Sequence, residues 1–147
     1  MVDEKDRRIL DKLRENSRMP TTEISEKLGI ARTTVHSRIE KMKEEEVIKK
    51  FTVRPDYSEL GRGTTAFVLI SFDPKAGVKQ KETARQISEI GMVDGLHIIS
   101  GEWDLLAKVR GESAEEIGDV VVEKLREIDG VEQSTTCVSF ETILEDC

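Results

Sequence analysis

Residues 64–72 constrain the fold most strongly, because they read T-T-A-F-V-L-I-S-F and predict a strand that is apolar on both faces. Alternate side chains of a strand point to opposite faces. One face therefore carries Ala66, Val68, Ile70 and Phe72, and the other carries Phe67 and Leu69. A strand of this kind needs apolar cover on both sides.

The rest of the second half alternates between helix and strand patterns. Helices are predicted over residues 80–90 and from a capping box at Ser113 and Glu116 to Asp129-Gly130. Strands are predicted over residues 93–100, 104–110 and 131–144. The order β-α-β-β-α-β is the ferredoxin-like pattern. Its two helices cover one sheet face, so we expect a second copy to cover the face of Phe67 and Leu69.

The first half predicts three short helices. Asp3 is placed to cap the first, and Thr21 to cap the second. A turn at Gly29-Ile30-Ala31 leads into a third helix from about Arg32 to Glu44, with Ala31 at the cap position. Two short helices joined by a tight turn that begins with Gly are typical of a helix-turn-helix.

The outward face of the third helix carries donors and cations that suit a DNA major groove. Base contacts are predicted from Arg32, Thr33, His36 and Ser37, with Thr34 at the flank. Phosphate contacts are predicted from Thr22, Arg38, Lys49, Lys50 and Arg54. Residues 27–54 hold eight Lys and Arg against four Glu, which suits phosphate contacts. The alternative is the solvated face of a plain three-helix bundle.

The charge of the chain is unevenly distributed. The 147 residues carry a formal net charge of −7, which by itself argues against a nucleic-acid binder. Residues 1–62, however, hold fifteen Lys and Arg against thirteen Asp and Glu, whereas residues 63–147 hold eight against seventeen. The acidic excess thus belongs to the second half, and we expect the first half to face DNA.

The segment between the two halves predicts a strand and a linker. Residues 47–54 contain Val47, Phe51 and Val53 among polar neighbours, and residues 56–63 are rich in turn formers. The expected fold class is therefore α+β, with a winged-type helix-turn-helix joined by a strand linker to a ferredoxin-like domain. The expected domains are residues 1–46 for DNA binding, 47–63 for the strand and linker, and 64–147 for oligomerisation and effector binding.

Four motifs resemble the leucine-responsive regulator / AsnC (feast/famine) family. They are D-E-K-D-R-R-I-L at residues 3–10, T-T-V-H-S-R-I at 33–39, E-V-I-K-K-F-T-V at 46–53 and S-G-E-W-D at 100–104. Glu46 stands where the family usually has Gly. The order and spacing of the motifs make the resemblance specific over nearly the whole chain. Together with the Glu- and Lys-rich composition, the resemblance suggests an archaeal or thermophilic source.

The resemblance implies a sequence-specific transcription regulator that binds double-stranded DNA. It also implies self-assembly into dimers, with octamers as the larger form, and a small-molecule effector, commonly an amino acid. By this resemblance, the effector loop of the family corresponds to Gly101, Glu102, Trp103 and Asp104. The hydroxyl groups that a neighbouring chain would contribute correspond to Ser134, Thr135 and Thr136. The alternative for this loop is a β-turn in which Gly101 and Asp104 serve geometry alone.

Enzymatic and membrane functions are weaker hypotheses. No nucleophile–base pair, metal-ligand spacing or phosphate loop is evident, so we expect no catalytic residues, metal or cofactor. A sirohaem-decarboxylase-like enzyme shares the architecture, but residues 63–147 lack the cations that an anionic tetrapyrrole needs. A third hypothesis, an assembly protein without DNA affinity, disagrees with the positive stretch at 27–54. Without a signal-peptide region or an apolar span, the chain is expected in the cytoplasm, with no membrane partner.

Overall fold

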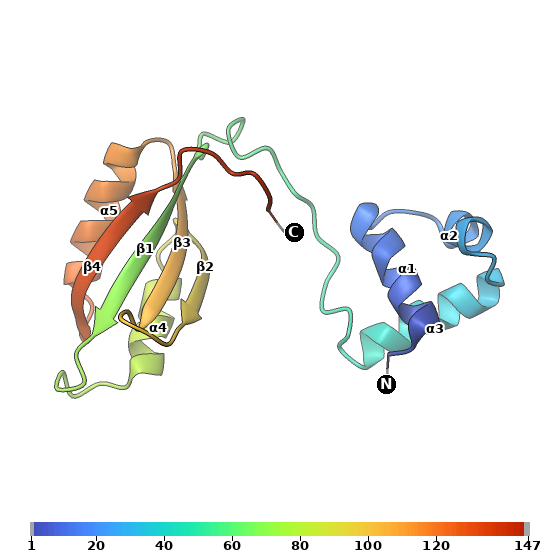
Figure 1. Cartoon of the computed structure of the whole chain (residues 1–147), viewed down its shortest axis with the longest axis horizontal. Coiled ribbons are helices and arrows are strands. Elements are labelled where there is room, and N and C mark those ends of the chain that lie inside the picture. Colours follow the sequence, from blue (N-terminus) through green and yellow to red (C-terminus); the bar gives the residue numbers. More distant parts are fainter. Residues whose placement is uncertain (1, 146–147) are drawn as a thin grey trace. The chain divides into compact units, whose positions relative to one another are not determined.

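The computed structural model describes residues 2–145, which form two compact units (Figure 1). One unit ends at Arg54 and the other begins at Pro55. Among the described residues, no helix is both long enough and apolar enough to cross a membrane.

The first unit is a bundle of three helices, α1 (Glu4–Glu15), α2 (Thr21–Leu28) and α3 (Arg32–Glu44). Asp3 and Asp6 form a reciprocal capping box at α1, in which each carboxylate accepts a hydrogen bond from the other residue's backbone N–H. The core is built from apolar side chains of all three helices, including Ile9, Ile24, Val35, Ile39 and Met42. These residues follow the apolar spacing of the sequence, which is why the three helices form as predicted.

The α2–α3 turn has the predicted helix-turn-helix form. Gly29 takes a left-handed backbone conformation with φ of 65°, which glycine adopts without steric cost. The hydroxyl of Ser25 donates a 2.6 Å hydrogen bond to the carbonyl of Ile30 and closes the turn. Ala31 supplies no side-chain cap to α3, because a methyl group cannot accept a hydrogen bond. The prediction of Thr21 as a cap is wrong by one residue, because Pro20 occupies the cap position and Thr21 is already helical.

The strand predicted over residues 47–54 does not form, so the described part of the first unit has no strand that could act as a wing. Val47, Phe51 and Val53 are exposed, Val53 by 80%. A strand requires the backbone of a second strand for its hydrogen bonds. The described part of this unit contains helices and irregular segments, so no such partner is available within it.

Glu46 follows the C-terminal cap of α3, Glu45, and has a left-handed conformation with φ of 55°. It is the one residue other than glycine with a positive φ in the described chain. A left-handed conformation is unfavourable for residues that carry a Cβ atom. This geometry explains why the related motif usually has Gly here, and it identifies Glu46 as a strained position.

The second unit has the predicted β-α-β-β-α-β order. Its elements are β1 (Thr64–Phe72), α4 (Gln80–Ser88), β2 (Val93–Ile98), β3 (Leu105–Gly111), α5 (Ala114–Arg126) and β4 (Val131–Val138). The four strands pair antiparallel in the order β2-β3-β1-β4. Ser113 caps α5 by accepting a hydrogen bond from the backbone N–H of Glu116.

Both helices lie on one side of this sheet (Figure 1). Ala66, Val68 and Ile70 are fully buried against side chains of α4 and α5, including Ile87, Ile117 and Leu125. Phe67 on the opposite face is 39% exposed. The alternation predicted for residues 64–72 is therefore confirmed, and no helix of the described residues covers the face of Phe67.

The last strand is shorter than predicted, because it ends at Val138 rather than near Leu144. Its pairing with β1 ends at Ala66 and Val138, and Ser139 makes the last backbone hydrogen bond, to the carbonyl of Thr65. Beyond Thr65, β1 has only Thr64 left to pair with. Phe140, Ile143 and Leu144 are exposed in the irregular C-terminal segment.

Candidate functional site

The outward face of α3 displays most of the predicted base-contacting side chains. Val35, Ile39 and Met42 are buried on the inner side of the helix. The side chains that are exposed on the outer side are Arg32, Thr33, His36 and Ser37, whereas Thr34 is half buried. The hydroxyl of Ser37 donates to the carbonyl of Thr34 at 3.1 Å and can still accept a hydrogen bond. The helix thus presents a polar, donor-rich surface, with Arg32 as the cation among the predicted base contacts and Lys41 and Lys43 exposed farther along the helix.

Arg38 has a position that the sequence pattern did not predict. Its guanidinium lies 2.7 Å from a carboxylate oxygen of Asp3 and 2.7 Å from one of Asp6. These hydrogen bonds, first to Asp6 and then to Asp3, raise the pKa of Arg38. The backbone N–H of Asp6 and the Arg38 guanidinium together lower the pKa of Asp3 to about 2. Arg38 therefore joins α3 to the start of α1.

The remaining predicted phosphate contacts lie on the surface of the first unit. Thr22 is exposed in the first turn of α2. Lys49, Lys50 and Arg54 are exposed in the irregular segment that follows α3. Their positions leave the positive stretch of residues 27–54 accessible.

The predicted effector loop connects β2 to β3. Gly101 has φ of 130°, a conformation that a residue with a side chain rarely adopts. Gly101 and Glu102 are exposed, whereas Trp103 and Asp104 are half buried. Asp104 accepts a 2.8 Å hydrogen bond from the backbone N–H of Phe72. Its own backbone N–H donates to the carbonyl of Ile70. Asp104 thus fastens the loop to the end of β1.

The three predicted hydroxyl residues do not contact this loop within one chain. Ser134 and Thr135 are exposed on the edge strand β4, and Thr136 is half buried there. Ser134 pairs with Ile70, whose partner on the other side is Leu105, the residue after Asp104. Two strand spacings, about 10 Å, therefore separate the loop from these hydroxyls. A ligand bound by both groups would need a neighbouring copy to bring them together.

No group of three or more His, Cys, Asp or Glu side chains is arranged to hold a metal ion among the residues described.

Two family signatures together cover most of the chain. Residues 2–43 match the AsnC-type helix-turn-helix domain, and residues 65–147 match the Lrp/AsnC ligand binding domain. An uncharacterised HTH-type transcriptional regulator of Pyrococcus furiosus is 53% identical over 146 residues, which make up 99% of this chain and 97% of that protein.

Solved structures with low sequence identity share the fold. Escherichia coli AsnC is similar with a TM-score of 0.87 at 22% identity, over 100% of this chain and 97% of that one. Transcriptional regulator NMB0573 of Neisseria meningitidis, solved as an L-Met complex, has a TM-score of 0.89 at 19% identity, over 99% of this chain and 94% of that one. The two domain matches and the Pyrococcus furiosus relative show that the chain belongs to the Lrp/AsnC family of helix-turn-helix transcriptional regulators.

Proposed function

We propose that this regulator reads specific DNA sequences by placing α3 in the major groove. The observation that carries the proposal is the two-sided character of α3, with Val35 and Ile39 buried and Arg32, His36 and Ser37 exposed. Arg favours guanine, and hydroxyl groups bond to bases or phosphates. Arg32, Thr33, His36 and Ser37 would contact bases, with Thr34 beside them.

Phosphate contacts would come from the exposed groups around this helix, namely Thr22, Lys49, Lys50 and Arg54. Arg38 would act differently from the sequence-based expectation. Its two ion pairs to Asp3 and Asp6 favour a positioning role, in which it fixes the angle of α3 against α1. We keep residues 1–46 as the DNA-binding domain, 47–63 as the connecting segment and 64–147 as the domain for assembly and effector binding.

The uncovered sheet face supports self-association. Phe67 and Leu69 pair across the sheet with Lys108 and Leu106, and the helices lie on the opposite side. A second copy that packs through the same face would bury these apolar groups in a two-fold interface. A dimer would carry two heads for two DNA half-sites, and octamers would be larger assemblies of such dimers.

The effector would be an amino acid bound at the loop of residues 101–104. Asp104 would accept a hydrogen bond from the α-amino group, and the backbone at Gly101 would approach the carboxylate. Ser134, Thr135 and Thr136 would come from a neighbouring copy, because within one chain they lie two strands away. The L-Met complex of the structurally similar NMB0573 supports an amino acid as the ligand class.

An enzymatic role is not favoured. The close relative is named a transcriptional regulator. A sirohaem-type substrate would need clustered cations, whereas the two cations on the described strands, Lys108 and Arg110, already pair with carboxylates.

A gel-shift titration on the promoter region of the protein's own gene tests the DNA-binding proposal. Arg32→Ala and Ser37→Ala should each weaken binding by about 1–3 kcal/mol, the usual loss for a good base contact. Lys81→Ala, which removes an exposed cation on α4, is the matched control and should bind like the wild type. Equal affinity for all four proteins would show that α3 is not the reading element.

A further inference from the structure

The segment before β1 closes into a compact turn. The carboxylate of Asp56 accepts hydrogen bonds from the backbone N–H and the hydroxyl of Ser58. The backbone N–H of Arg62 donates to the carbonyl of Tyr57 at 2.8 Å. Residues 56–62 therefore have a defined shape, although they form neither a helix nor a strand.

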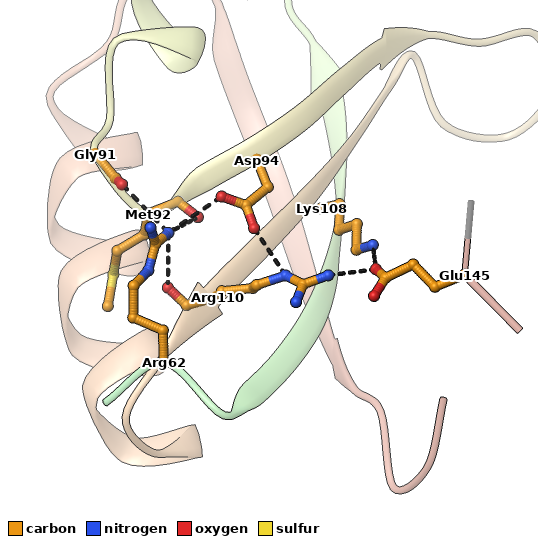
Figure 2. Close-up of polar contacts among 7 residues, drawn as sticks. All are labelled: Arg62, Gly91, Met92, Asp94, Lys108, Arg110 and Glu145. Carbon is orange, nitrogen blue, oxygen red and sulfur yellow. Dashed lines mark hydrogen bonds and ion pairs between the residues drawn. The ribbon is translucent and has the colours of Figure 1, made fainter. Parts of the chain in front are cut away.

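The side chain of Arg62 fixes this turn on the sheet (Figure 2). Its terminal nitrogen Nη2 lies 3.2 Å from a carboxylate oxygen of Asp94. The same nitrogen lies 3.4–3.5 Å from three backbone carbonyls, those of Gly91, Met92 and Arg110. Arg62 thus contacts the start of β2 and the end of β3 at once.

The ring of Tyr57 adds a second contact. Its centroid lies 3.7 Å from the central carbon of the Arg110 guanidinium, the geometry of a cation–π interaction. Arg110 is only 6% exposed. We call the contacts of Tyr57 and Arg62 with β2 and β3 the linker clasp. These contacts lie within one chain and require no open surface on the sheet face of Phe67.

Asp94 meets both arginines at an irregularity of β2. The pairing of β2 with β3 shifts by one residue between Val93 and Gly95, so Asp94 has no partner of its own in the ladder. Such a bulge re-aims the side chain of the extra residue. The Asp94 carboxylate lies between the guanidinium groups of Arg62 and Arg110, 2.7 Å from Nε of the latter. The folded sheet therefore provides the acceptor for the clasp.

The clasp shortens the chain that connects the two units. Ile48 packs against the core of the first unit, and residues 49–54 are exposed. With the clasp formed, the connecting chain, which we call the tether, is the seven residues 49–55. Without the clasp it is the fifteen residues 49–63. The first tether spans at most about 25 Å, and the second about 50 Å.

We propose that Arg62 is a positioning residue for DNA binding, because the clasp it forms limits the half-site spacings that a dimer can bind. The inference rests on the proposed function, in which the two DNA-binding heads of a dimer bind two half-sites. After one head binds, the second binds at an effective concentration that depends on the length of the tether. A short tether favours one spacing, whereas a long tether reaches more spacings at a lower effective concentration.

Gel-shift titrations on duplexes with two half-sites at different spacings test the inference. The half-sites are those that the wild type protects in the promoter region of its own gene. Five added base pairs move the second half-site by about 17 Å and turn it to the other side of the duplex. The wild type should lose affinity there by a larger factor than Arg62→Ala does. At the best spacing Arg62→Ala should bind about threefold weaker, because the effective concentration falls with roughly the −3/2 power of the tether length.

Three controls separate the tether from other effects. A duplex with a single half-site engages one head, so the wild type and Arg62→Ala should bind it equally. Glu59→Ala changes an exposed side chain of the same segment and should keep the wild-type spacing profile. Inserting eight Gly and Ser residues between Arg54 and Pro55 adds the same length to a protein with an intact clasp, and should reproduce the profile of Arg62→Ala. An Arg62→Ala profile equal to the wild type would overturn the inference, and so would a loss of affinity for the single half-site.

Hydrogen exchange measures the clasp without DNA. The backbone N–H groups of Leu60, Gly61 and Arg62 donate to carbonyls of the same turn. They should exchange slowly in the wild type and faster in Arg62→Ala, whereas the N–H groups of β1 should be protected in both proteins. Rapid exchange of the three turn groups in the wild type would overturn the inference. A wild type that binds no duplex, although these groups are protected, would instead contradict the proposed function, and with it the role of Arg62.

Discussion

Asp104 accepts a 2.8 Å hydrogen bond from the backbone N–H of Phe72, which joins the β2–β3 loop to the end of β1. This bond gives Asp104 a structural role beside its proposed role toward an effector. The two interpretations of the loop, geometry or ligand binding, are therefore not exclusive. The side chain of an asparagine could accept the same hydrogen bond from Phe72 through its amide oxygen. It would lack the negative charge that is proposed to attract the α-amino group of an effector.

Two substitutions at Asp104 separate these roles. Asp104→Ala leaves the N–H of Phe72 without its partner and should lower the free energy of unfolding by about 1–3 kcal/mol, measured in urea. Asp104→Asn should stay close to the wild type in stability. It should nevertheless lose any change of DNA affinity caused by L-methionine, the amino acid used as probe. Equal loss of stability in both variants would contradict the hydrogen-bonding role.

The first unit should lose stability in acid through Asp3. Its pKa is lowered from 3.8 to about 2 in the folded state, so its stabilising contribution is complete above about pH 4 and declines as the pH falls toward 2. Urea unfolding monitored by circular dichroism between pH 5 and pH 2 measures the decline. Asp3→Asn should show a smaller decline than the wild type. Asp11→Asn, which changes an exposed carboxylate on the same helix, should not.

Glu46 should be a site where glycine stabilises the protein. Its φ of 55° is unfavourable for any residue with a Cβ atom, whereas glycine adopts it without strain. Glycine also adds conformational entropy to the unfolded chain, which offsets part of this gain. We therefore expect Glu46→Gly to raise the free energy of unfolding by about 0.5–1 kcal/mol. Glu44→Gly, two residues earlier at the last helical position of α3, should instead destabilise by up to about 1 kcal/mol. A destabilised Glu46→Gly would mean that the left-handed turn is not formed.

Self-association should depend on the uncovered sheet face. Phe67→Glu places a charge on that face, where the side chain is 39% exposed in the single chain. Sedimentation should show a shift toward monomer, while the helix signal in circular dichroism persists. Leu60→Glu, at a 60% exposed position in the segment before the sheet, serves as control and should sediment like the wild type. An unchanged oligomer in Phe67→Glu would contradict assembly through this face.

Elements with strong local patterns could be predicted from the sequence. The strand over residues 64–72 and the helix from Arg32 to Glu44 form with the predicted bounds. Their apolar residues recur with the period of a strand or a helix because those are the side chains that become buried. The strand predicted over residues 47–54 does not form, because a strand needs a second backbone beside it and the local pattern does not show whether one is available. For the same reason the last strand ends at Val138, because β1 extends only two residues beyond its partner Ala66.

Local sequence patterns could not predict side-chain partners that lie far apart in the sequence. Arg38 was expected to contact phosphate because it lies in a positive stretch. The structure pairs it with Asp3 and Asp6, more than thirty residues earlier. The ion pairs of Lys108 and Arg110 (Figure 2) were missed for a similar reason, since their carboxylates come from β2 and the C-terminal segment. The spacing of Lys108 and Arg110 by two was the available signal, because it puts both cations on one sheet face.

The salt dependence of DNA affinity tests the central claim most directly, that the positive head binds DNA while the acidic domain does not. The logarithm of the binding constant should fall linearly with the logarithm of salt concentration as phosphate contacts release counterions. In the double variant Lys49→Gln, Lys50→Gln the slope should shrink by about 2, one for each lost contact. The control Lys75→Gln, Lys79→Gln, in the second unit, should keep the wild-type slope. A slope near zero in the wild type, or an equal loss of slope in both double variants, would contradict the account.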